Sequence, residues 1–123
     1  MIYTINKHDN FDIIELQEDL KNLSERDNLV LAIDEIYVSN RNLILNLNGK
    51  QILESSFYEV IKSYHEKFYE QNCSFVVCHL NEVNKSKIKS IDLEEIQFAP
   101  QLIEAIDIVS MEILERDILG EDF

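Results

Sequence analysis

Residues 43–80, LILNLNGKQILESSFYEVIKSYHEKFYEQNCSFVVCHL, contain the clearest pattern of secondary structure in this chain. It begins with a short apolar run, Leu43–Leu47, and closes with a second one, Phe75–Leu80. Between them, apolar residues recur at helical spacing behind two consecutive serines, Ser55 and Ser56. Runs that are apolar at nearly every position are typical of parallel strands covered on both faces. The stretch therefore predicts a strand, a helix and a second strand parallel to the first.

The central helix is expected to begin at Ser56. Ser56 and Glu59 have the spacing of a capping box, an arrangement that stabilises a helix by about 1 kcal/mol. Asn72 can adopt the left-handed conformation that ends a helix. The buried face of this helix is predicted to consist of Phe57, Val60, Ile61, Tyr64 and Phe68.

Before this unit, Ile2–Ile5 and Phe11–Leu16 read as two strands joined by a polar turn, which predicts an N-terminal hairpin. Apolar residues at helical spacing then predict a helix over Glu25–Val38. Ser24 and Asp27 resemble a capping pair at its start.

After the unit, Glu82–Ser90 is expected to form a short polar helix, and Glu95–Ala99 an edge strand. Pro100 is expected in the first turn of a last helix, which stops near Gly120. The core face of that helix is predicted to be Leu102, Ala105, Ile106, Val109 and Ile113.

A second apolar line, formed by Met111, Leu114 and Ile118, follows the distal half of the last helix. Such stripes are more often core than interface, so we expect these side chains to wrap the hairpin. The alternative is a surface for a homodimer or for another partner.

Residues 1–123 are expected to form a single domain, with a hairpin over 1–17, a core over 25–119 and a short tail over 120–123. The order of the elements predicts an α/β fold: a mixed, mostly parallel sheet of about five strands with about four helices packed on it.

The chain has 24 acidic and 11 basic residues, a net charge of -13. This charge repels phosphate backbones and anionic lipids, so we expect neither nucleic-acid nor membrane binding. The one basic cluster, Lys85, Lys87 and Lys89, reads as a solvent-facing helix side. The sequence has no signal peptide and no run of about 18 apolar residues, so we expect a cytoplasmic protein that meets a basic protein surface.

The sequence lacks the residue patterns of several kinds of binding and catalytic site. Gly49 and Gly120 are the only glycines, too few for a phosphate-binding loop. The three histidines fall on different elements without ligands at metal spacing, so no metal or other cofactor is expected. Cys73 and Cys78 are expected to be buried free thiols. We therefore expect no enzyme activity.

The element order and three segments, LILNLNGKQILESSFYEVI, CSFVVCHL and IQFAPQLIEAIDIV, resemble the STAS domain, the family of the anti-sigma factor antagonists. In that family the first segment usually ends in Asp-Ser-Ser-Gly or Asp-Ser-Thr-Gly. Here the corresponding residues are Glu54, Ser55, Ser56 and Phe57. The resemblance implies that the domain binds an anti-sigma factor, which is often also its kinase. It further implies that phosphorylation of Ser56 breaks the complex, and Ser55 is the alternative candidate for this phosphorylation.

Two departures from the family pattern affect this corner. Phe57 replaces a glycine, so its ring is expected either to obstruct a kinase or to anchor a partner. Asn46 stands where many members have Asp, and it serves either as a partner contact or as part of the turn at Asn48 and Gly49. We expect the partner-binding residues to be Asn46, Glu54, Ser55, Ser56, Phe57, Tyr58 and Glu59. The alternatives are a degenerate domain that acts as a constitutive scaffold, and a sensor of a small ligand at the strand ends.

Overall fold

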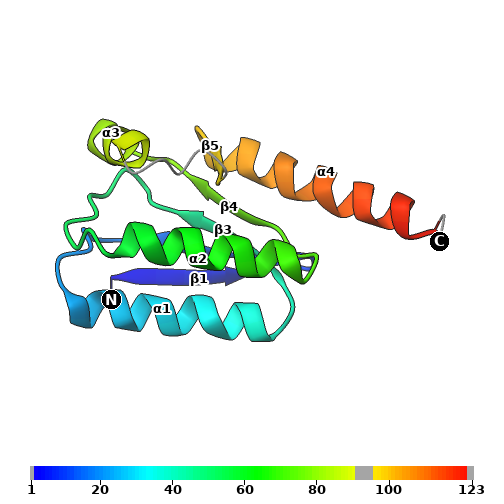
Figure 1. Cartoon of the computed structure of the whole chain (residues 1–123), viewed down its shortest axis with the longest axis horizontal. Coiled ribbons are helices and arrows are strands. Elements are labelled where there is room, and N and C mark those ends of the chain that lie inside the picture. The colour runs from blue at the N-terminus through cyan, green and yellow to red at the C-terminus, as the bar shows by residue number, and fades with distance from the viewer. Residues whose placement is uncertain (1, 91–95, 122–123) are drawn as a thin grey trace.

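The computed structural model describes residues 2–90 and 96–121, and these residues form a five-stranded sheet with helices on both faces (Figure 1). The described elements are β1 Tyr3–Lys7, β2 Phe11–Leu16, α1 Leu23–Val38, β3 Asn42–Asn46, α2 Phe57–Glu70, β4 Phe75–Cys78, α3 Glu82–Ser90, β5 Gln97–Ala99 and α4 Leu102–Glu121. The expected α/β fold with a mixed, mostly parallel sheet is confirmed.

The strands follow one another across the sheet in chain order. β1 is antiparallel to β2, which confirms the predicted hairpin, and the remaining neighbours are parallel. Crossover connections between parallel strands are almost always right-handed. When each new strand is added on the same side of the previous one, the crossover helices therefore lie on one face of the sheet. Accordingly, α1 and α2 lie side by side on one face, and α4 covers the other (Figure 1).

Alternating side chains of the strands divide the core into two layers. One set packs under α1 and α2, and it includes Ile14, Leu43, Leu45, Phe75 and Val77. The intervening set packs under α4, and it includes Ile13, Ile44, Val76 and Cys78. This period of two explains why the strands are apolar at nearly every position. The predicted core face of α4 is confirmed, because Ala105 and Val109 are fully buried there.

The start of α1 differs from the prediction. The helix begins at Leu23, and the Asn22 side chain accepts a hydrogen bond from the Glu25 amide at 2.9 Å. Glu25 reaches back to accept from the Lys21 amide at 2.8 Å. The Ser24 and Asp27 pair is therefore wrong as a cap, because Asn22 and Glu25 form the same box two residues earlier.

The C-terminal part also shows differences. Pro100 lies before α4 rather than in its first turn, since that helix begins at Leu102. The strand predicted from Glu95 is observed as Gln97–Ala99, and Glu95 itself is outside the described residues. α4 continues to Glu121, close to the predicted end near Gly120.

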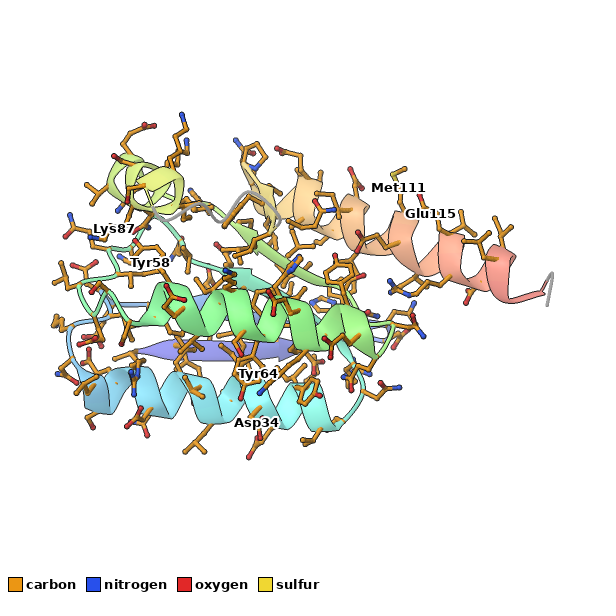
Figure 2. The ribbon with its side chains drawn as sticks, viewed as in Figure 1. Asp34, Tyr58, Tyr64, Lys87, Met111 and Glu115 are labelled. Carbon is orange, nitrogen blue, oxygen red and sulfur yellow. The ribbon has the colours of Figure 1, made fainter. Side chains whose placement is uncertain are left out.

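The distal half of α4 carries the apolar line predicted to wrap the hairpin. That prediction is wrong, because Met111, Leu114 and Ile118 keep 61%, 59% and 54% of their surface exposed. α4 extends past the end of the sheet (Figure 1), and Met111 points away from it (Figure 2). No element of the described chain therefore covers this line.

Other local predictions are confirmed. Asn72, two residues after the last residue of α2, has a positive φ of 62°, as expected of a residue that ends a helix. Cys73 and Cys78 are free and buried. Within residues 2–90 and 96–121, no helix has the length and apolar character needed to cross a membrane.

Candidate functional site

The candidate site is the corner where the loop after β3 meets the starts of α1 and α2. Leu20, just before α1, forms a parallel bridge with Ile52 in that loop. The Leu20 amide donates to the Gln51 carbonyl at 2.9 Å, and the Leu53 amide donates to the Leu20 carbonyl at 2.8 Å. These bonds hold residues from two distant parts of the sequence together, and so they position the first turn of α1 beside Ser56.

Ser56 occupies the N-cap position of α2 but does not cap it. Its φ and ψ are -62° and -17°, a helical conformation, and its side chain makes no capping bond. A capping serine needs an extended backbone to direct its oxygen at the amides of the first turn. The predicted capping box between Ser56 and Glu59 is therefore wrong, and the hydroxyl is available for other contacts.

The Ser56 hydroxyl lies between a carboxylate and a guanidinium. It donates to Glu54 Oε1 at 2.6 Å and accepts from Arg26 Nη1 at 2.8 Å. Arg26 is held in turn by Asp27, whose Oδ1 lies 2.8 Å from Nη2 and 3.2 Å from Nε. Charge-assisted bonds of this length are stronger than neutral ones. The serine oxygen is therefore ordered, partly exposed and next to a cation.

The sequence reading missed Arg26. It lies 30 residues before Ser56, in a helix that was predicted from its apolar spacing and a capping pair, neither of which involves Arg26. No local pattern links the two residues, because their contact depends on how the loop after β3 docks against the segment before α1.

The residues predicted to bind a partner separate into two groups. Glu54 and Ser56 are partly exposed, and Ser55 and Glu59 are exposed. By contrast, the side chains of Asn46, Phe57 and Tyr58 are buried, at 4%, 0% and 2% exposure.

Each buried side chain has a structural role. Phe57 packs in the core under α2, so both readings of its ring as a surface feature, the partner anchor and the obstacle to a kinase, are wrong. The Tyr58 hydroxyl donates to Asn84 Oδ1 at 3.0 Å, and burial raises the pKa of Tyr58. Asn46 Oδ1 accepts from the Asn48 amide at 2.9 Å, as the turn alternative predicted.

No protein-family model matches this chain, and no curated protein matches it significantly. Solved structures do match. An anti-sigma factor antagonist from Mycobacterium paratuberculosis superposes with a TM-score of 0.76 at 18% identity, over 88% of this chain and 92% of that chain. An anti-sigma factor antagonist (STAS) domain protein from Planctomyces limnophilus gives 0.71 at 14% identity, over 88% and 97%. The anti-sigma factor antagonist SpoIIAA in its unphosphorylated form gives 0.70 at 12% identity, over 88% and 97%. This protein therefore has the fold of the STAS domain.

Proposed function

We propose that this protein is a non-enzymatic regulator that binds a partner protein through the Ser56 corner, and that phosphorylation of Ser56 switches this binding. The observation that carries the proposal is the position of the Ser56 hydroxyl. It is bonded to Glu54 and Arg26 rather than used as a helix cap. The solved structures with the same fold include anti-sigma factor antagonists, and one of these is described in its unphosphorylated form.

A phosphate on Ser56 would reorganise the corner through charge. It adds close to two negative charges and removes the hydrogen that Ser56 now donates to Glu54. Glu54 would then face a like charge, while Arg26 would face an opposite one. The loop that contains Glu54 would have to move, and the surface offered to a partner would change with it.

The exposed surface of the corner indicates the chemistry of the partner. Glu54, Glu59 and Asp27 are acidic and at least partly exposed, on a chain with a net charge of -13. Leu53 adds an apolar side chain that is 58% exposed. A partner whose surface is complementary to this corner would be basic, with an apolar centre that covers Leu53. We propose that the partner is an anti-sigma factor that also phosphorylates Ser56. The interaction would take place in the cytoplasm, where ATP is present.

The test combines phosphate mapping with partner capture. The purified chain is incubated with ATP and a lysate of its source cells, and the modified residue is located by mass spectrometry. The expected result is one phosphate, on Ser56, which Ser56→Ala abolishes and Ser55→Ala does not. In capture from the same lysate, Ser56→Asp should lose the partner that wild type and Ser56→Ala retain. Ser63→Asp is the matched control, because it adds the same charge at an exposed position of the same helix.

The capture experiment also distinguishes the scaffold alternative. If no phosphate appears and Ser56→Asp holds the same partner as wild type, the domain binds constitutively and the switch is wrong. If Ser63→Asp also loses the partner, the effect is one of general charge and not of the Ser56 corner.

The exposed line on α4 supports a separate proposal, a homodimer through Met111, Leu114 and Ile118. Three large apolar side chains on one side of a helix lose unfavourable contact with water when a second copy covers them.

A further inference from the structure

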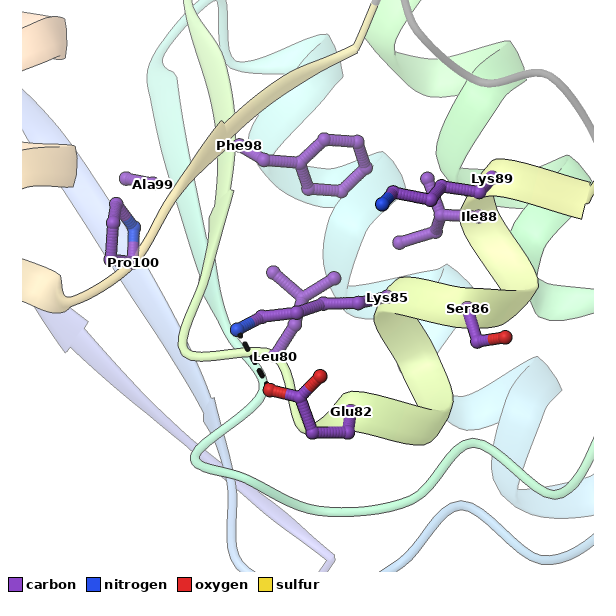
Figure 3. A pocket seen from close by; sticks show the side chains of 9 residues that line it. All are labelled: Leu80, Glu82, Lys85, Ser86, Ile88, Lys89, Phe98, Ala99 and Pro100. Carbon is purple, nitrogen blue, oxygen red and sulfur yellow. Dashed lines mark hydrogen bonds and ion pairs between the residues drawn. The ribbon is translucent and has the colours of Figure 1, made fainter.

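A pocket of about 500 Å³ opens beyond the ends of β4 and β5, next to α3 (Figure 3). It shares no lining residue with the Ser56 corner. Its position is the one where α/β sheets commonly bind ligands, outside the carboxyl ends of parallel strands. Its volume also falls in the range of small-molecule sites.

One side of the pocket is apolar. Leu80 follows β4, Phe98 belongs to β5, and Ile88 projects from α3. Ala99 and Pro100 complete this side. Figure 3 shows the Phe98 ring and the Leu80 and Ile88 side chains around one common space. Leu80 and Phe98 are partly exposed and Pro100 is exposed, so an apolar ligand body gains free energy by covering them.

The other side carries positive charge. Lys85 and Lys89 are four residues apart on α3, and both line the pocket. In Figure 3 their side chains extend from the helix toward β5. Lys85 lies 3.4 Å from Glu82, whereas no carboxylate among the described residues pairs with Lys89. The third lysine of α3, Lys87, does not line this pocket.

We propose that this pocket binds a small organic carboxylate, with its head group on Lys89 and Lys85 and its apolar tail against Leu80, Ile88 and Phe98. A single negative charge fits the site better than a phosphate, because the whole chain carries a charge of -13 and repels multiply charged anions. The apolar side requires a ligand body that inorganic anions lack. This site is independent of the switch at Ser56.

The experiment uses octanoate as the probe and the full chain as the protein. Titration calorimetry measures affinity, and amide shifts in two-dimensional NMR locate the site. Octanoate is expected to bind saturably at one site and to shift amides of α3 and β5. Acetate, which keeps the head group, and octanamide, which keeps the tail, should each bind at least about tenfold more weakly, because each lacks one of the two contacts.

Variants of α3 test the role of the lysines. Lys89→Gln should weaken octanoate binding about three- to tenfold, as expected from the loss of one charge-assisted contact. Lys89→Arg should retain binding. Lys87→Gln is the matched control, since it removes the same charge from the same helix outside the pocket, and it should change the affinity by less than about twofold.

Four results would overturn the proposal. They are no saturable binding of octanoate at millimolar concentration, equal binding of octanamide, shifts confined to other elements, and equal weakening by Lys87→Gln and Lys89→Gln. The last result would indicate attraction by the general field of α3 rather than a site.

Discussion

At the scale of single residues, the thiol of Cys78 is an ionisable group without solvent exposure. Cys78 is 0% exposed at the end of β4, packed between the sheet and α4. Burial, followed by the negative charges of Glu104 and Glu15, raises its pKa from 9.0 to about 12. The folded state therefore favours the protonated thiol more strongly than the unfolded chain does.

This shift predicts a loss of stability in alkaline solution. The protonated thiol contributes fully below pH 9.0, and the contribution is lost as the pH rises through about 12. Between about pH 9 and 10, the free energy of unfolding should fall by up to about 1.4 kcal/mol per pH unit because of this one group. Urea unfolding at several pH values measures the slope. Cys78→Ala should reduce this slope without abolishing it, because burial also raises the pKa of the Cys73 thiol from 9.0. The comparison is made at the lower end of the window, before Tyr64, with a pKa raised from 10.0 to about 12, begins to contribute.

Ser110→Ala is the control for this measurement, because Ser110 is exposed on α4 and does not titrate. It should keep the wild-type slope. A Cys78→Ala variant with the wild-type slope between about pH 9 and 10 would show that Cys78 does not contribute to it.

The candidate site illustrates which residue-level features a sequence can reveal. The position of Ser56 at the start of a helix was predicted from apolar spacing, and α2 begins one residue later. The capping role assigned to its side chain was wrong, since capping needs an extended backbone and the angles at Ser56 are helical. The helical spacing predicted Phe57 on the buried face of this helix, and that prediction is confirmed. Only the surface roles inferred from its place beside Ser56 are wrong, because they ignored that spacing.

At the scale of elements, the cap of α1 gives a direct comparison between two neighbouring residues. Asn22 and Glu25 each accept a hydrogen bond from a backbone amide at this helix start, whereas Ser24 is exposed inside the first turn. Asn22→Ala should therefore lower the free energy of unfolding by about 1 kcal/mol. Ser24→Ala should change it by less than about 0.5 kcal/mol, as is usual for surface positions. Urea unfolding measures both, and a larger loss for Ser24→Ala would contradict the observed cap.

The elements themselves were predicted well where the signal is local. The strands and helices of the central unit follow from apolar runs and helical spacing, and their ends differ from the prediction by a few residues. The partly buried ion pair between Asp12 and Arg41 could not be predicted. The Arg41 guanidinium lies 3.1 Å (Nε) and 2.9 Å (Nη2) from the Asp12 carboxylate and fixes the hairpin to the start of β3. Its partners are 29 residues apart, so only the register of β2 with β3 brings them together.

In the whole molecule, the exposed apolar side chains of α4 favour association of two copies, whereas the net charge of the chain opposes it. The helix extends beyond the sheet with Met111, Leu114 and Ile118 uncovered, which favours association of two copies. Glu115 and Asp117 are exposed on the same part of the helix, and each copy carries a net charge of -13. Two copies therefore repel one another over the distance at which their apolar lines would meet.

This opposition predicts a homodimer that salt strengthens. Screening shortens the reach of the repulsion from roughly 10 Å at 0.1 M salt to roughly 3 Å at 1 M, while the apolar contact persists. The dimer fraction measured by sedimentation velocity should therefore rise between these concentrations of sodium chloride. Leu114→Glu should abolish the dimer, because it places a charge in the centre of the apolar line. Leu31→Glu is the matched control, since Leu31 is 65% exposed on α1 and the same change there should leave the dimer intact. A chain that stays monomeric at high salt, or one that Leu31→Glu disrupts as strongly as Leu114→Glu, would refute dimerisation through α4.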